Sequence, residues 1–126
     1  MPGRLQAFQE FRQKMNEKIL ARGNLQMKRF FALDSQAYQD GALPAKTKEL
    51  LGLVASLVLR CDDCISYHLI QCAQLGVTDD ELFEAFHVAL IVGGSIVIPH
   101  LRRAVEMLEE IRDTQSHSQT KKRRPS

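Results

Sequence analysis

Apolar residues recur three or four positions apart along almost the whole chain, the spacing that places them on one face of an α-helix. No stretch alternates apolar and polar residues over four or more positions between hairpin turns, so no β-strand is indicated. Glycine and proline interrupt the helical pattern at intervals. We therefore expect an all-α fold, a single-domain helical bundle of about six helices. The expected helices cover about residues 5–21, 25–38, 44–60, 62–76 and 79–92, followed by one that has Pro99 in its first turns and ends near Asp113.

The 126 residues divide into three expected parts of one domain. Residues 1–42 form an N-terminal helical segment that packs on the core. Residues 43–113 form the core, in which the helix that Pro44 opens is apolar enough from Leu50 onward to be buried on most sides. Residues 114–126 are too polar to be buried and are expected to form a disordered basic tail.

The charge balance excludes several classes of function. The formal net charge is +2 at pH 7, but residues 114–126 hold four basic and no acidic residues, which leaves 13 basic against 15 acidic side chains in residues 1–113. The folded part has no basic excess, and we expect no nucleic-acid partner. The longest apolar stretches, 50–59 and 88–99, are too short to span a bilayer, and the N-terminus lacks the apolar run of a signal peptide. We expect no membrane association and a cytoplasmic location.

The cysteines form the most informative motif in the chain. Three cysteines, two of them three positions apart, fit a reducing compartment and a catalytic or metal-binding pair better than a secreted disulfide framework. On a helix, Cys61, Cys64 and His68 lie on one face, because successive residues turn by about 100°. Two sulfurs at positions i and i+3 near a helix N-terminus can close a disulfide with little backbone movement, which is the geometry of a redox dithiol.

The same face offers a route for a proton. His68 is placed to take the proton of the Cys64 thiol, directly or through one water, and a carboxylate such as Glu49 could hold the imidazole in the required tautomer. The helix N-terminus and the charge of Arg60 favour the thiolate, whereas the two aspartates between the cysteines oppose it. The direction of the thiol pKa shift is therefore left open by the sequence.

The remaining cysteine and histidines have less specific interpretations. A zinc site would need a fourth ligand besides Cys61, Cys64 and His68, and no second C-x-x-C or H-x3-H motif supplies one in the usual way. The candidates for that ligand are Cys72, His87 and His100. A buried packing thiol explains the cysteine better, and core or interface positions explain the two histidines better. We expect no metal and no cofactor.

The combination of these residues resembles a known family. Its spacing is Glu49-x11-Cys61-x2-Cys64-x3-His68, followed by the Gly76-x-Thr78 turn and the Gly93-Gly94 break. This pattern resembles the carboxymuconolactone decarboxylase-like superfamily, and within it the alkylhydroperoxidase D-like branch, over residues 43–108. The resemblance implies a small all-α protein that assembles as a homo-oligomer, a trimer or a hexamer. The apolar run at residues 82–98 is consistent with such an interface.

The resemblance also assigns roles to the four residues. Cys64 matches the peroxidatic cysteine, which attacks the peroxide and becomes a sulfenic acid, and Cys61 matches the resolving cysteine, which closes the disulfide. His68 and Glu49 match the proton relay that activates Cys64. Where the alkylhydroperoxidase itself has a histidine immediately before the second cysteine, this chain has Asp63.

The expected function is that of a thiol-dependent peroxidase and disulfide oxidoreductase, a peroxiredoxin-type enzyme that takes a hydroperoxide as substrate and a thiol or a protein as reductant. Two alternatives stay open. A carboxymuconolactone decarboxylase-type lyase would use His68 and Glu49 as acid and base and would not need the cysteines. A non-catalytic helical module would use Cys61, Cys64 and His68 to bind zinc or to sense the redox state.

Overall fold

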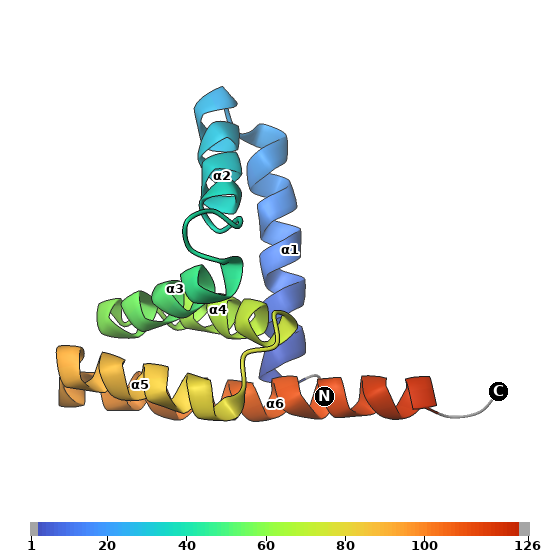
Figure 1. The fold of residues 1–126 in the computed structure, drawn as a ribbon. Helices are drawn as coiled ribbons and strands as arrows, with labels where there is room; N and C mark the ends of the chain where they lie inside the picture. The colour runs from blue at the N-terminus through green and yellow to red at the C-terminus, as the bar shows by residue number, and fades with distance from the viewer. Residues whose placement is uncertain (1–2, 124–126) are drawn as a thin grey trace.

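The computed structural model describes residues 3–123, which are helical over nearly their whole length (Figure 1). The helices are α1 (Arg4–Arg22), α2 (Leu25–Ala37), α3 (Ala45–Leu59), α4 (Asp62–Gln74), α5 (Asp79–Gly93) and α6 (Ile98–Arg123), and a 3-10 turn, η1 (Ser95–Val97), precedes the last of them. No strand occurs among the described residues. The predicted all-α class with six α-helices is confirmed.

Local signals in the sequence set several helix boundaries. The Thr78 hydroxyl accepts a hydrogen bond from the backbone N–H of Glu81, and the Glu81 carboxylate accepts one from the N–H of Thr78, which together form a capping box. The side chain of Asn24 caps α2 by accepting from the N–H of Met27. Gly76 takes a positive φ of 80°, which only glycine adopts without strain, and this turns the chain from α4 toward α5.

The turn between α3 and α4 depends on a residue other than glycine. Arg60 ends α3 in the left-handed conformation, with a φ of 61°. A left-handed residue at this point ends the helix and lets backbone N–H groups reach the carbonyls of the last turn. Cys61 follows directly and is the N-cap residue of α4. The turn therefore places Cys61 and Cys64 at the start of α4.

The core lies among α3, α4, α5 and α6. Helix α3 packs against α4 and α5, and α4 packs against α6. The fully buried side chains of this core include Leu53, Leu57, Leu69, Leu82, Phe86 and Met107. Burial of each such side chain contributes about 1.5–3 kcal/mol. Two ionisable residues, Glu49 and His68, are also buried, so each needs a polar partner within the protein.

The two N-terminal helices form an arm that stands away from this core (Figure 1). The start of α1 packs on α4 and α6, where Leu5 is buried and Phe8 contacts the core. Helix α2 has no buried residue, and its Phe30 is 70% exposed. Of the N-terminal segment expected to pack on the core, the described structure thus places mainly the first half of α1 there, while α2 buries no residue.

The prediction of a disordered tail from residue 114 is wrong for most of that segment, because α6 continues to Arg123. Side chains near the expected end anchor the helix to the core: Arg112 donates to Asp79 and to the carbonyl of Val77, and Gln115 donates to the carbonyl of Ala73. No proline or glycine follows until Pro125. Residues 124–126 lie outside the described residues. None of the described helices combines the length and the apolarity needed to cross a bilayer.

Candidate active site

The two cysteines of the C-x-x-C motif form a disulfide at the N-terminus of α4. Cys61 and Cys64 are joined, with their Cα atoms 5.3 Å apart, which is within the usual range for a disulfide. The sulfur of Cys61 also accepts a hydrogen bond from the backbone N–H of Cys64 at 3.2 Å and so caps the helix. Cys64 is exposed and Cys61 is half-buried. The pairing that the sequence spacing allows is therefore present.

Glu49 and His68 form a buried pair between α3 and α4. The Nδ1 atom of His68 lies 2.7 Å from Oε2 of Glu49, and the two residues are 7% and 3% exposed. An ionised carboxylate can only accept a hydrogen bond, so Nδ1 carries the proton that is shared with Glu49. The Nε2 atom is then free to act as an acceptor. The structure thus brings together the two residues that the sequence pattern places 19 positions apart.

Tyr38 is a neighbour of this pair that the sequence analysis did not identify. Its hydroxyl lies 3.5 Å from Nε2 of His68, at the long limit of a hydrogen bond. Burial, and next the negative charges of Asp34 and Glu49, raise the pKa of Tyr38, so the phenol stays protonated and can donate. Tyr38 lies at the end of the helix expected over residues 25–38, but no motif connects that helix with His68, so the spacing carried no signal for this contact.

Gly52 is the second residue that the sequence analysis missed. It lies one turn after Glu49 on α3, and a Cβ atom built there would be 2.6 Å from Cε1 of His68 and 2.8 and 2.9 Å from the two ring nitrogens. The imidazole therefore rests directly on the backbone of α3. Only a residue without a side chain leaves room for the ring at this place.

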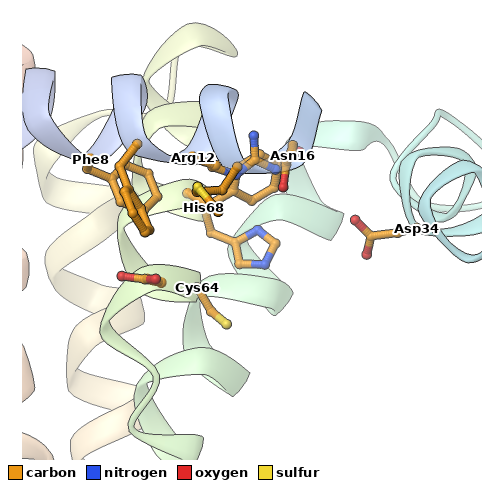
Figure 2. Close-up of a pocket in the computed structure, with 10 residues that line it drawn as sticks. Phe8, Arg12, Asn16, Asp34, Cys64 and His68 are labelled. Carbon is orange, nitrogen blue, oxygen red and sulfur yellow. The ribbon is translucent and has the colours of Figure 1, made fainter. Parts of the chain in front are cut away.

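A pocket of about 350 Å³ opens beside these residues. Its walls come from α1, α2 and α4, and both Cys64 and His68 line it (Figure 2). Within the described part of the chain, no hydrogen bond joins the two side chains directly in this disulfide form. A small molecule in the pocket could therefore reach the sulfur of Cys64 and the imidazole from the same side.

The aspartates beside the dithiol differ in their surroundings. Asp62 binds Nδ1 of His100 at 2.8 Å and Nε of Arg103 at 2.9 Å, both from α6. Burial opposes ionisation of Asp62, but the hydrogen bond from His100 and the charge of Arg103 outweigh it, and the net pKa is lowered. The charge of Asp62 is thus compensated by a cation, whereas Asp63 is exposed and lines the pocket.

The other candidate ligands lie apart from this site. Cys72 is buried in the core, and burial raises the pKa of its thiol to about 12, so the prediction of a packing thiol is confirmed. His87 is exposed on α5, so of the predicted core or interface positions the core is excluded, and His100 pairs with Asp62. Among the described residues, no three His, Cys, Asp or Glu side chains form a group that could hold a metal ion.

Comparison with known proteins identifies the fold. A structure from Thermotoga maritima, described as a carboxymuconolactone decarboxylase family protein with possible involvement in antioxidative response, superposes with a TM-score of 0.85 and 61% identity, covering 89% of this chain and 95% of its own. An apo structure of a family member from Legionella pneumophila has a TM-score of 0.79 and 28% identity, covering 85% and 96%. An uncharacterized protein of the cox locus in Paracoccus denitrificans is 32% identical over 82 residues, which are 65% of this chain and 74% of that protein.

The family model described as the carboxymuconolactone decarboxylase family matches residues 25–107, well over half of the chain. The matched range contains the disulfide, the buried Glu49–His68 pair and Gly52. The family expected from the spacing of Glu49, Cys61, Cys64 and His68 is therefore confirmed. The chain belongs to the carboxymuconolactone decarboxylase family.

Proposed function

We propose that this protein is a thiol-dependent peroxidase that reduces hydroperoxides through Cys64 and Cys61. The observation that carries the proposal is the placement of Cys64: it is joined to Cys61 in a disulfide and lines the same pocket as His68, whose Nδ1 atom is held by Glu49. A lyase would not require this cysteine pair. The possible antioxidative involvement of the Thermotoga maritima relative supports the same class of reaction.

The reaction takes place in two steps at the cysteines. The Cys64 thiolate attacks the terminal oxygen of ROOH, so that an S–O bond forms, the O–O bond breaks, and the alkoxide leaves with a proton as ROH. Cys61 then attacks the sulfur of the Cys64 sulfenic acid, so that the S–S bond forms, the S–O bond breaks, and hydroxide leaves as water with the proton that the Cys61 thiol gives up. The peroxide gains two electrons, and an external dithiol or a protein thiol restores both cysteines.

His68 and Glu49 handle the proton in this scheme. Nε2 of His68 takes the proton of the Cys64 thiol, and the imidazolium then gives it to the departing alkoxide. The carboxylate of Glu49 fixes Nδ1 as the protonated nitrogen and stabilises the imidazolium while the thiolate exists. Burial strengthens this effect, because the pair is removed from the screening of water.

The proposed biological setting follows the sequence analysis. A hydroperoxide is the substrate, and a thiol or a protein serves as reductant in a reducing, cytoplasmic compartment. The expected homo-oligomer, a trimer or a hexamer, remains a prediction that sedimentation can test.

The test is peroxide consumption by the reduced protein with dithiothreitol as electron donor. The wild type should consume hydrogen peroxide and tert-butyl hydroperoxide faster than dithiothreitol alone, and Cys64→Ser should not. Cys61→Ser should accumulate a sulfenic acid at Cys64, which dimedone traps and mass spectrometry locates. Cys72→Ser is the matched control and should retain turnover, because that thiol is buried away from the pocket. Turnover that survives in Cys64→Ser would refute the proposal.

The same set of proteins distinguishes the lyase alternative. A decarboxylase would convert a lactone acid with both cysteines replaced by serine and would lose activity in His68→Gln. If the wild type forms the disulfide but consumes no peroxide, the pair acts as an electron relay and the peroxidase proposal fails.

A further inference from the structure

The pocket beside Cys64 has a wall that the family match does not cover. Helix α1 supplies Phe8, Phe11 and Met15 to this wall, and α1 precedes the matched range that begins at residue 25. These side chains give the pocket an apolar surface next to the sulfur. Its volume of about 350 Å³ lies at the small end of the range for small-molecule sites.

Among the described residues, the one Lys or Arg side chain that lines the pocket is Arg12 of α1 (Figure 2). Its guanidinium lies over the ring of Tyr67, with Cζ 4.3 Å from the ring centroid. Among the described residues, no carboxylate lies within ion-pair distance of Arg12. Stacking on an aromatic ring uses the face of the guanidinium and leaves its N–H edge for an acceptor in the plane.

Asn16 adds a second donor beside Arg12. The two residues are four positions apart on α1, so their side chains lie on one face of the helix, and both line the pocket. The described part of the chain gives the Asn16 amide no hydrogen-bond partner. A planar guanidinium and a neighbouring amide are donors suited to the two oxygens of a carboxylate.

The other charges of the pocket limit which anion can bind. Asp34 of α2 and Asp63 of α4 also line it, so one cation faces two carboxylates. A ligand with a single negative charge can place that charge on Arg12. A second anionic group on the ligand would meet the field of the aspartates without a further cation.

We propose that the pocket binds an apolar monocarboxylate, with its carboxylate on Arg12 and Asn16 and its hydrocarbon body against Phe8, Phe11 and Met15. If the proposed peroxidase function holds, on which this extension rests, the substrate class is a carboxylate-bearing organic hydroperoxide, such as an oxidised fatty acid. Helix α1 then selects the substrate, and α4 carries out the chemistry.

The test measures binding without peroxide, so that it does not depend on the peroxidase activity. The reduced protein is alkylated with iodoacetamide, and the rate at Cys64 is followed by mass spectrometry in the presence of octanoate or octanol. Octanoate should slow alkylation at lower concentration than octanol. In Arg12→Gln, the octanoate concentration for half protection should rise about tenfold, as expected for loss of a hydrogen-bonded charge, while octanol is unaffected. Suberate, with two carboxylates, should protect less than octanoate.

Lys14→Gln is the matched control, because it removes one positive charge from the exposed side of α1 without touching the pocket. It should leave the octanoate effect unchanged. The inference is overturned if octanoate and octanol protect equally, if Arg12→Gln changes nothing, or if Lys14→Gln acts as strongly as Arg12→Gln.

Kinetics then separate this inference from the proposed function. Arg12→Gln should raise KM for a fatty-acid hydroperoxide by a larger factor than KM for tert-butyl hydroperoxide, which has no carboxylate. An equal loss with both peroxides would overturn the inference, because Arg12 would then act on the reaction instead of on the carboxylate. Arg12-dependent protection by octanoate in a protein without peroxide turnover would support the binding site and refute the peroxidase.

Discussion

Replacement of Gly52 by alanine tests whether the position of the His68 imidazole is necessary for the chemistry at Cys64. The added Cβ would lie 2.6–2.9 Å from three atoms of the ring, whereas ordinary contacts begin near 3.4 Å. The nearest ring atom must therefore move by about 0.8 Å. Glu49 binds one side of the ring, and the rings of Tyr38 and Tyr67 lie with their centroids 5.2 Å away, so the imidazole cannot move without losing a partner.

The expected cost falls on activity more than on stability. A displacement of this size in a catalytic group lowers kcat/KM by roughly a hundredfold. Alanine is favoured over glycine inside a helix by about 1 kcal/mol, which offsets part of the roughly 1–3 kcal/mol that overpacking costs. Gly52→Ala should thus be destabilised by no more than about 2 kcal/mol and should remain folded.

The assay combines the rate of peroxide consumption, the pH dependence of Cys64 alkylation by iodoacetamide, and unfolding in urea. Gly93→Ala is the matched control, because its Cβ would lie 2.5 Å from Cγ2 of Val97, a buried residue outside the pocket. That variant should lose stability but keep activity. If Gly52→Ala retains a rate within threefold of the wild type and an unchanged alkylation profile, the positioning argument is wrong.

Three further predictions concern stability, thiol reactivity and assembly. Asp62→Asn should destabilise the oxidised protein more at pH 7 than at pH 3: the pKa of Asp62 is lowered on folding, so its contribution is present above the unfolded value and is lost as the pH falls through the folded one. Urea unfolding should show that the variant loses less than about 1 kcal/mol of unfolding free energy at pH 7, because the side chain of Asp62 is 44% exposed. Equal losses at both pH values would contradict this prediction. Cys72, with a pKa of about 12, should resist iodoacetamide at pH 8 until urea unfolds the protein, and labelling in the native state at the rate of Cys64 would disprove its burial. Ile91 is 75% exposed on α5 and should lie in an interface between copies of the chain. The variant Ile91→Asp should therefore sediment more slowly than the assembled wild type. A wild type that is monomeric at 10 µM would exclude this interface.

The helices could be predicted from the sequence because their signals are local. The capping box at Thr78, the proline before α3 and the glycine after α4 each act within one turn of the boundary that they set. The predicted end of α6 was wrong because the contacts that extend this helix are distant in sequence. Polarity after Asp113 suggested disorder, but Arg112 and Gln115 bind carbonyl groups that are 35 and 42 residues away in sequence.

The same distinction separates the parts of the site. Cys61, Cys64 and His68 could be grouped because they share one face of a helix. Glu49 was a candidate carboxylate for His68, and the resemblance to the family assigned it that role. Tyr38 could not be found, because it contacts His68 from 30 residues away in sequence and no motif links the two positions. Gly52 has no side chain to suggest a role, and its importance appears only when the ring that occupies the space above it is known.

Arg12 lies on α1, apart from the helix that carries Cys61, Cys64 and His68, and this separation bears on how substrate specificity can change. The reacting groups must keep their spacing, because a thiol, its resolving partner and a base have to meet within a few ångströms. Helix α1 has no such restriction: it contacts the core through Leu5 and Phe8 and presents its next two turns to the pocket. A change of residue in those turns alters the charge and shape of the pocket without moving the dithiol. If the proposed function and the Arg12 site hold, substrate choice in this chain can therefore change through α1 while the chemistry at the start of α4 stays the same.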